Sequence, residues 1–246
     1  ETPDEERYVQ FDPLGSVLAV MPWNFPFWQV YRFAAPAIMA GNVGLLKHAS
    51  NVPQCAQAIE ESFRACGFPE GVFLNLRVSA SRVEKIIRDP RVAAVTLTGS
   101  EKAGSDVARI AGSEIKKTVL ELGGTDPFIV FPDADIESAV DNALYGRLQD
   151  NTGQSCIAAK RFVIHRDVVE QFTKLLSEKL STYIVGDPTD PQTNVGPLAT
   201  EQGLLDVMTQ VDESIKLGAT LVYGGKRREG KGYFYLPTIL TGVVSG

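Results

Sequence analysis

Short apolar runs alternate with amphipathic stretches through the first half of the chain, and this alternation restricts the fold more than any other feature. Apolar runs of the length of a buried strand occur at residues 16–21, 43–47, 72–76, 93–97 and 117–122. Stretches with helical periodicity lie between them, at residues 27–40, 53–66, 80–87 and 101–111. Strands that alternate with helices form right-handed crossovers and a parallel sheet. The pattern therefore predicts the α/β class.

The pattern changes after Gly123 and Gly124, which suggests a domain boundary. The second half predicts helices at residues 136–148, 168–181 and 201–217, and strands or extended segments at 128–131, 161–165, 220–223 and 233–240. A loop rich in Pro, Asp and Thr spans 186–197. We therefore expect two α/β domains, residues 1–122 and 123–246. We expect both to be incomplete, because the first strand lacks a preceding core element and the last extended segment lacks a neighbour.

Charge and cysteine content exclude several classes of function. The net charge of −6 argues against nucleic acid as a partner, which needs clustered Lys and Arg. No apolar run is long enough to span a bilayer, and the polar first residues do not resemble a signal peptide. Three scattered cysteines and two histidines provide neither a disulfide framework nor metal-ligand spacing. We expect a cytoplasmic protein with no membrane, nucleic-acid or metal partner.

Cys156 follows a glycine-containing turn, Asn151-Thr152-Gly153-Gln154-Ser155, and precedes an apolar stretch. A free thiol has a pKa near about 8.5, so a nucleophilic cysteine needs local help to ionise. Backbone N–H groups of such a turn can supply that help. A buried structural cysteine is the competing interpretation, and spacing alone does not decide between them.

Glu121 and Asn24 are two further candidates. Glu121 ends an apolar run and precedes two glycines; a buried carboxylate there would act as a base near neutral pH. Taken alone, however, this position is more typical of a glutamate that pairs with a lysine or emerges into solvent at a strand end. Asn24 lies between aromatic and proline residues after the first strand, where a rigid amide can stabilise an oxyanion. Its alternative role is a cap or turn residue for the following helix.

Two places in the chain, at Gly99-Ser100 and at Lys47, could bind a nucleotide. Gly99 and Ser100 join a strand to a helix, an arrangement that lets phosphate approach the helix N-terminus. The sequence there is not the G-x-G-x-x-G fingerprint. Lys47 lies at the carboxyl end of a strand, where open α/β sheets bind ligands, although an isolated lysine is more often a surface charge.

Taken together and in order, these motifs resemble the aldehyde dehydrogenase superfamily over essentially the whole chain. The likeness lies in residues 22–26, Lys47, residues 98–100, 120–124, 153–156, and 186–188 through 196–198. Residues 46–52, 121–127 and 156–162 are most similar to the bacterial succinate-semialdehyde dehydrogenases. The resemblance implies an aldehyde-dehydrogenase-like α/β fold, with a Rossmann-type parallel cofactor sheet followed by an α/β catalytic domain.

The resemblance also implies residue roles in oxidation of an aldehyde to its acid. Cys156 would attack the carbonyl, and the Asn24 amide with the Cys156 N–H would hold the oxyanion. Hydride transfer to the nicotinamide would leave a thioester, which water activated by Glu121 would hydrolyse. Arg32 matches the position that grips the distal carboxylate of a semialdehyde, which suits its fork geometry. A simple helix-surface arginine remains the alternative for Arg32.

The implied cofactor is NADP, with NAD as the alternative. Lys47 and Ser50 would lie at the adenosine ribose, where a small hydroxyl leaves room for a 2′-phosphate that a glutamate would repel. The resemblance further implies cofactor contacts for Trp23, Gly99, Ser100, Glu121 and Leu122. It implies a homo-oligomer for the full-length family.

Two departures from the family pattern bear on activity. Cys156 follows Glu121 by 35 positions, one more than the family pattern, and Asp150 is the candidate extra residue. An extra acidic residue there would displace the thiol or raise its pKa. The chain is also shorter than the family. A truncated, impaired member that only binds nucleotide or a partner is therefore an alternative, and a cofactor-free cysteine hydrolase or acyltransferase is another.

Overall fold

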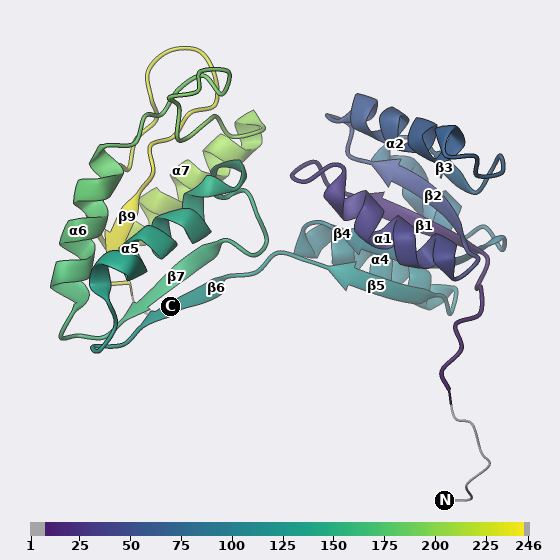
Figure 1. The fold of residues 1–246 in the computed structure, drawn as a ribbon, viewed down its shortest axis with the longest axis horizontal. Helices are drawn as coiled ribbons and strands as arrows, with labels where there is room; N and C mark the ends of the chain where they lie inside the picture. The colour runs from purple at the N-terminus through teal and green to yellow at the C-terminus, as the bar shows by residue number, and fades with distance from the viewer. Residues whose placement is uncertain (1–7, 244–246) are drawn as a thin grey trace, which may run out of the picture. The chain divides into compact units, whose positions relative to one another are not determined.

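The computed structural model describes residues 8–243, apart from the side chain of Gln149 (Figure 1). These residues form two compact units, the first ending at Gly123 and the second beginning at Gly124. That the first binds cofactor and the second carries the chemistry stays a prediction.

The first unit contains a five-stranded sheet with the order β3-β2-β1-β4-β5. Its strands are β1 (Ser16–Met21), β2 (Val43–His48), β3 (Phe73–Asn75), β4 (Val92–Thr98) and β5 (Lys117–Glu121). Every neighbouring pair is parallel, which confirms the predicted α/β class. Because the strands are parallel, their carboxyl ends meet at one edge of the sheet.

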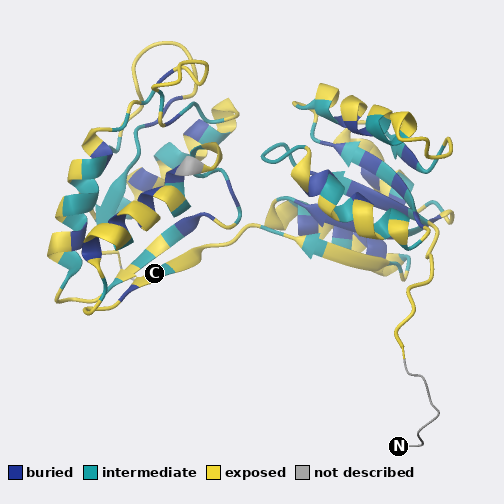
Figure 2. Ribbon diagram, in the orientation of Figure 1, coloured by how far each residue is buried: buried dark blue, intermediate teal, exposed yellow. Residues whose placement is uncertain are grey.

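Helices cover both faces of this sheet (Figure 1). They are α1 (Trp28–Met39), α2 (Pro53–Ala65), the 3₁₀ turn η1 (Ala80–Arg82), α3 (Val83–Ile87) and α4 (Glu101–Ser113). Leu18 of β1 packs in the cluster that contains residues of α3 and α4. The next residue, Ala19, packs with residues of α1 and α2. Alternate strand side chains therefore face opposite helix layers, and Figure 2 shows the buried strands beneath the exposed outer faces of the helices.

The strand β5 lies at the edge of the sheet and is largely exposed, in contrast to β4 beside it. Val119, in the middle of β5, is 60% exposed. The helices α1 and α2 pack over β1, β2 and β3, since their buried residues cluster with residues of these strands. The face of β4 and β5 on the α1 side is left as an open groove.

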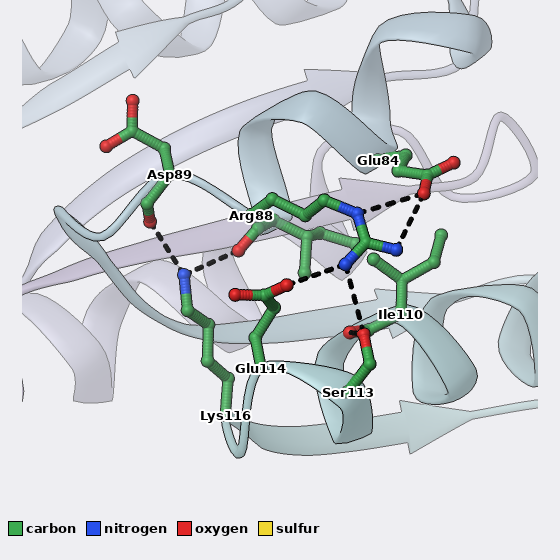
Figure 3. A network of polar contacts seen from close by, with 8 residues as sticks. Glu84, Arg88, Asp89, Ile110, Ser113, Glu114 and Lys116 are labelled. Carbon is green, nitrogen blue, oxygen red and sulfur yellow. Dashed lines mark hydrogen bonds and ion pairs between the residues drawn. The ribbon is translucent and has the colours of Figure 1, made fainter.

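A polar network ties α3 to the end of α4 (Figure 3). Arg88 donates to Glu84, to Ser113 and to Glu114. Lys116 donates to the backbone oxygens of Ile87 and Asp89. These residues precede β4 and β5, so the network fixes the amino ends of the two strands, away from their carboxyl ends.

The second unit is built on the parallel pair β6 (Asp126–Val130) and β7 (Ala159–Ile164). The helices α5 (Ile136–Leu144) and α6 (Val169–Ser181) share one core with this pair, in which the tilted rings of Phe128, Phe162 and Phe172 pack in series. The helix α7 (Glu201–Lys216) leads to an antiparallel pair, β8 (Thr220–Tyr223) and β9 (Ile239–Thr241).

Two predicted elements of the second unit were wrong in detail. The predicted helix at 136–148 is α-helical only to Leu144 and continues as the π-helical turn η2 (Tyr145–Gln149). A π turn closes i→i+5 bonds and holds one more residue than an α turn, which periodicity does not reveal. The predicted extended segment at 233–240 forms a strand only at β9, with one isolated bridge between Arg227 and Tyr235.

Candidate active site

The carboxyl edge of the five-stranded sheet gathers most of the predicted site residues of the first unit. Trp23 and Asn24 follow β1, Lys47 lies in β2 with Ser50 just beyond, Gly99 and Ser100 follow β4, and Glu121 ends β5. The connections from β1 and from β4 run toward opposite sides of the sheet, so β1 and β4 flank its topological switch point. Open α/β sheets bind ligands at such a point.

His48 holds the turn that carries Trp23 and Asn24. Its Nε2 lies 2.9 Å from the carbonyl oxygen of Pro26, and the N–H of Ala49 donates to its Nδ1 at 2.9 Å. An Nδ1 that accepts leaves the ring hydrogen on Nε2, which donates to Pro26. Burial lowers the pKa of His48, so the imidazole is neutral at pH 7. Sequence reasoning missed this residue, although its place at the end of a buried strand was a signal.

Asn24 does not cap the helix that follows it. The helix α1 begins at Trp28, its N-cap is Phe27, and no side chain caps it. The Oδ1 of Asn24 instead accepts a hydrogen bond from the N–H of Phe25 at 3.1 Å. The alternative of a helix cap was therefore wrong, and the oxyanion role stays a prediction.

The ends of β2 and β4 supply groups that fit a phosphorylated nucleotide. Lys47 is half-buried, which lowers the pKa of its ammonium, while Ser50 is exposed. Ser100 caps α4 by accepting from the N–H of Ala103 at 3.3 Å. A Cβ added to Gly99 would approach only the side chain of Leu97, at 3.6 Å or more, so the turn is open to an approaching ligand. These groups combine a cation, hydroxyls and a helix N-terminus.

Leu122 faces the first unit's core. Its side chain packs against the cluster that contains residues of α4, and a Cβ on Gly104 would lie 2.5 Å from its Cδ2. A side chain at position 104 would therefore force the Leu122 side chain to shift. Because its side chain packs in the core, only the backbone of Leu122 could contact the cofactor. That contact stays a prediction.

Arg32 of α1 and Glu121 of β5 lie together. The Nη2 of Arg32 is 3.8 Å from the Oε2 of Glu121, and their side chains are 43% and 55% exposed. Of the two interpretations of Glu121, the structure agrees with a strand end that emerges into solvent and not with a buried carboxylate, because β5 is an edge strand. Its cationic partner is an arginine and not the lysine that was considered. Arg32 and Glu121 both line the open groove, which has a volume of about 460 Å³.

The loop before Cys156 has an unusual backbone. Asn151, Thr152 and Gly153 have φ angles of 52°, 58° and 74°. Residues other than glycine rarely adopt this left-handed region, and such strain gathers at functional sites. Arg147 donates to the carbonyl oxygen of Gly153 at 3.2 Å and is largely buried, which lowers the pKa of its guanidinium. A Cβ on Gly153 would lie 2.3 Å from the carbonyl oxygen of Arg147.

Lys160 of β7 organises the segment around Cys156. Its Nζ donates to the carbonyl oxygens of Ser155, Cys156 and Ala158, at 3.0, 2.9 and 3.1 Å. In a trans peptide, the N–H of the next residue points opposite to the carbonyl. The N–H groups of Cys156 and Ile157 therefore point away from Lys160. Sequence reasoning missed Lys160.

Asp150 lies between the π turn η2 and the 3₁₀ turn η3 (Asn151–Gly153), and it is exposed. One extra residue at this place fits the extra residue that a π turn holds. The effect of Asp150 on the thiol stays a prediction.

The candidate residues are therefore divided between the two units. The first unit brings together Arg32 and Glu121, and the second positions Cys156, which is half-buried and makes no disulfide. The approach of Cys156 to Glu121 and Asn24 stays a prediction. No three or more His, Cys, Asp or Glu side chains of the described chain are placed to hold a metal ion. Within residues 8–243, no helix has the length and apolar character needed to cross a membrane.

Comparison with known proteins places this arrangement in a family. Residues 1–245 match the Aldehyde dehydrogenase family. The chain is 60% identical over 237 residues to a succinate-semialdehyde dehydrogenase [NADP(+)] of Mycobacterium avium (strain 104), covering 96% of this chain and 50% of that protein. It is 59% identical over 236 residues to succinate-semialdehyde dehydrogenase [NADP(+)] 1 of Mycobacterium tuberculosis (strain ATCC 25618 / H37Rv), covering 96% of this chain and 51% of that protein.

Comparison with a solved structure supports the same family. The crystal structure of succinic semialdehyde dehydrogenase from Streptococcus pyogenes, in complex with NADP+, superposes with a TM-score of 0.91 at 42% identity, over 95% of this chain and 51% of that one. The chain belongs to the aldehyde dehydrogenase family, and it spans about half the length of the curated relatives it matches.

Proposed function

We propose that this chain forms part of an NADP-dependent dehydrogenase that oxidises a small aldehyde with a distal carboxylate, such as succinate semialdehyde, to the acid. The observation that carries the proposal is the pairing of Arg32 with Glu121 in one groove. This places a cation suited to a carboxylate beside the carboxylate that the family resemblance assigns as the base. The names of the relatives that are about 60% identical support the same substrate.

The residues at the carboxyl edge would hold the nucleotide. Lys47 and Ser50 would bind the ribose and its 2′-phosphate, and the N-terminus of α4 at Gly99 and Ser100 would bind the pyrophosphate. Trp23, Glu121 and Leu122 would adjoin it. Bound NADP+ would accept the hydride. Ser50 offers a hydroxyl rather than a carboxylate, which favours NADP over NAD.

The protein residues would divide the remaining work. The thiolate of Cys156 would add to the aldehyde carbon and form a thiohemiacetal, whose oxyanion the Cys156 N–H and the Asn24 amide would stabilise. Loss of hydride from that carbon would leave a thioester on Cys156. Water would attack the thioester carbon as Glu121 takes its proton, and the C–S bond would then break, which releases the acid and restores the Cys156 thiolate.

The test follows NADPH absorbance after succinate semialdehyde is added to the purified chain. We expect NADP+-dependent turnover that Cys156→Ala abolishes. Cys66→Ala is the matched control, since Cys66 is also free but exposed on the first unit. Binding of NADPH by calorimetry without turnover would support an impaired, nucleotide-binding member of the family. Thioester or ester hydrolysis without NADP+ would support a cysteine hydrolase.

We further propose that the protein acts in the cytoplasm as a homo-oligomer. Three free cysteines are compatible with a reducing compartment. The oligomer follows from the family resemblance alone. Light scattering during size-exclusion chromatography would test it, and a monomeric mass would contradict it.

A further inference from the structure

Gln29 is a buried polar residue of α1 that the proposed chemistry does not use. It is the second residue of the helix and is only 4% exposed. Its Oε1 has no hydrogen-bond partner among the described residues. A buried polar atom without a partner costs free energy, so native proteins tolerate few of them. Such an atom beside a groove can gain a partner when neighbouring polar groups rearrange on ligand binding.

Gln29 lines the same groove as Arg32 and Glu121. Gln29 and Arg32 are three residues apart on α1, which places them on one face of the helix. Because α1 follows β1, its first turns lie toward the carboxyl edge of the sheet. The groove is also lined by apolar residues, among them Leu14, Val17, Phe33, Pro36 and Ala37, and by the polar residues Asn42, Thr96, Thr98 and Lys117. Lys117 begins β5 and Glu121 ends it, so Arg32 is the cation of the groove that lies beside Glu121, with Gln29 on the same face of α1.

The chemistry of an amide matches this place. A carboxylate accepts hydrogen bonds at two oxygens, more than one guanidinium fork satisfies. The Nε2 of Gln29 can donate to the carboxylate oxygen that Arg32 leaves free. The Oε1 of Gln29 can accept from a guanidinium N–H that does not contact the carboxylate. One ligand would then satisfy all of these groups.

We propose that Gln29 is a second ligand for the distal carboxylate of the substrate, acting with Arg32. The inference rests on the function proposed above and deepens it. Gln29 selects aldehydes with a terminal carboxylate against uncharged aldehydes of the same length. It does not take part in the covalent steps.

The test measures binding of succinate, the dicarboxylate product, by calorimetry in the presence of NADP+. The variants are Gln29→Met, which keeps the shape but removes the amide, and Gln29→Glu, which adds a like charge. Gln54→Leu is the control, since Gln54 is exposed on α2. We expect Gln29→Met to weaken succinate binding about 10-fold and Gln29→Glu to weaken it further, with NADP+ binding unchanged.

Thermal unfolding separates a binding role from a structural one. Removal of a buried, unpaired amide should leave the Tm of Gln29→Met unchanged or raise it. A lower Tm together with weaker binding of both succinate and NADP+ would overturn the inference in favour of a packing role.

Two outcomes separate this inference from the proposed function. If both Gln29 variants bind succinate as the unaltered chain does, while Arg32→Met does not, Gln29 is no ligand and the proposed function stands. If the unaltered chain binds NADP+ but not succinate and turns over no semialdehyde, the proposed function fails and the role of Gln29 fails with it.

Discussion

The ammonium group of Lys160 donates a hydrogen bond to the carbonyl oxygen of Cys156, with the two atoms 2.9 Å apart. Lys160 also bonds the carbonyls of Ser155 and Ala158, and three acceptors need all three hydrogens of a protonated amine. Burial, together with the charge of Arg147, lowers the pKa of Lys160. A cation partly removed from water therefore fixes the backbone on both sides of the proposed nucleophile.

Replacement of Lys160 by Met should release this segment. We expect iodoacetamide to alkylate Cys156 more slowly, and turnover to fall on the order of 10-fold or more, because small displacements of a nucleophile are costly. Peptide mass spectrometry resolves the three cysteines, so exposed Cys66 serves as an internal standard. Lys174→Met, on an exposed face of α6, is the matched control. Equal alkylation rates at Cys156 in the two variants would contradict a positioning role.

The Arg32→Met substitution should weaken substrate binding while changing the stability of the chain little. The Arg32–Glu121 pair is about half exposed, so its loss should change the free energy of unfolding by less than about 1 kcal/mol. The KM for succinate semialdehyde should rise by about 10- to 100-fold, because a charge-assisted contact with the carboxylate is lost. Butanal, which has no carboxylate, is the comparison substrate. A similar change in KM for both aldehydes would argue against carboxylate recognition by Arg32.

His48 should make stability depend on pH. Burial lowers its pKa in the folded chain, so below about pH 6.5 the unfolded chain binds more protons than the folded one. The free energy of unfolding should therefore be fully retained above about pH 6.5 and fall as the pH drops toward the lowered pKa. Urea unfolding between about pH 5 and about pH 8 measures this. His48→Gln should flatten the dependence, whereas His165→Gln, at an exposed position, should not.

Gly153→Ala should destabilise the second unit strongly. Its φ of 74° is unfavourable for alanine, and the added Cβ would lie 2.3 Å from the carbonyl oxygen of Arg147. Gly67→Ala isolates the backbone cost, since Gly67 has a φ of 81° and nothing within 4 Å. We expect about 1 kcal/mol for Gly67→Ala and at least about 2 kcal/mol more for Gly153→Ala. Equal losses in chemical denaturation would mean that the loop relaxes around the methyl group.

The sequence was sufficient for the α/β class, because strand and helix periodicities differ and local patterns record them. It also indicated which candidates follow the carboxyl ends of strands, such as Lys47 and Gly99. It could not indicate that β5 lies at an edge, since strand order depends on contacts between distant segments. For this reason the sequence alone could not decide between a buried and an exposed Glu121.

The sequence also could not predict side-chain roles that depend on the direction of backbone groups. Nothing in the sequence distinguishes Lys160 from the other lysines. In the structure, its ammonium group donates to three carbonyl oxygens. Gln29 lay in a helical pattern where an amide carries no signal, and only its burial without a partner marks it. The roles of Cys156 and Asn24 were inferred from family resemblance, and neither periodicity nor composition would have assigned them.

The π turn at Tyr145–Gln149 has a consequence for how this chain tolerates changes in length. The segment that contains Asp150 joins β6 to β7, which pair in one register from Pro127 to Val130, with an irregularity only between Asp126 and Pro127. If Asp150 is an extra residue, a wide turn before it would take up that residue without changing this register. A variant that lacks Asp150 should then keep the core of β6 and β7 and differ only in the loop before Cys156.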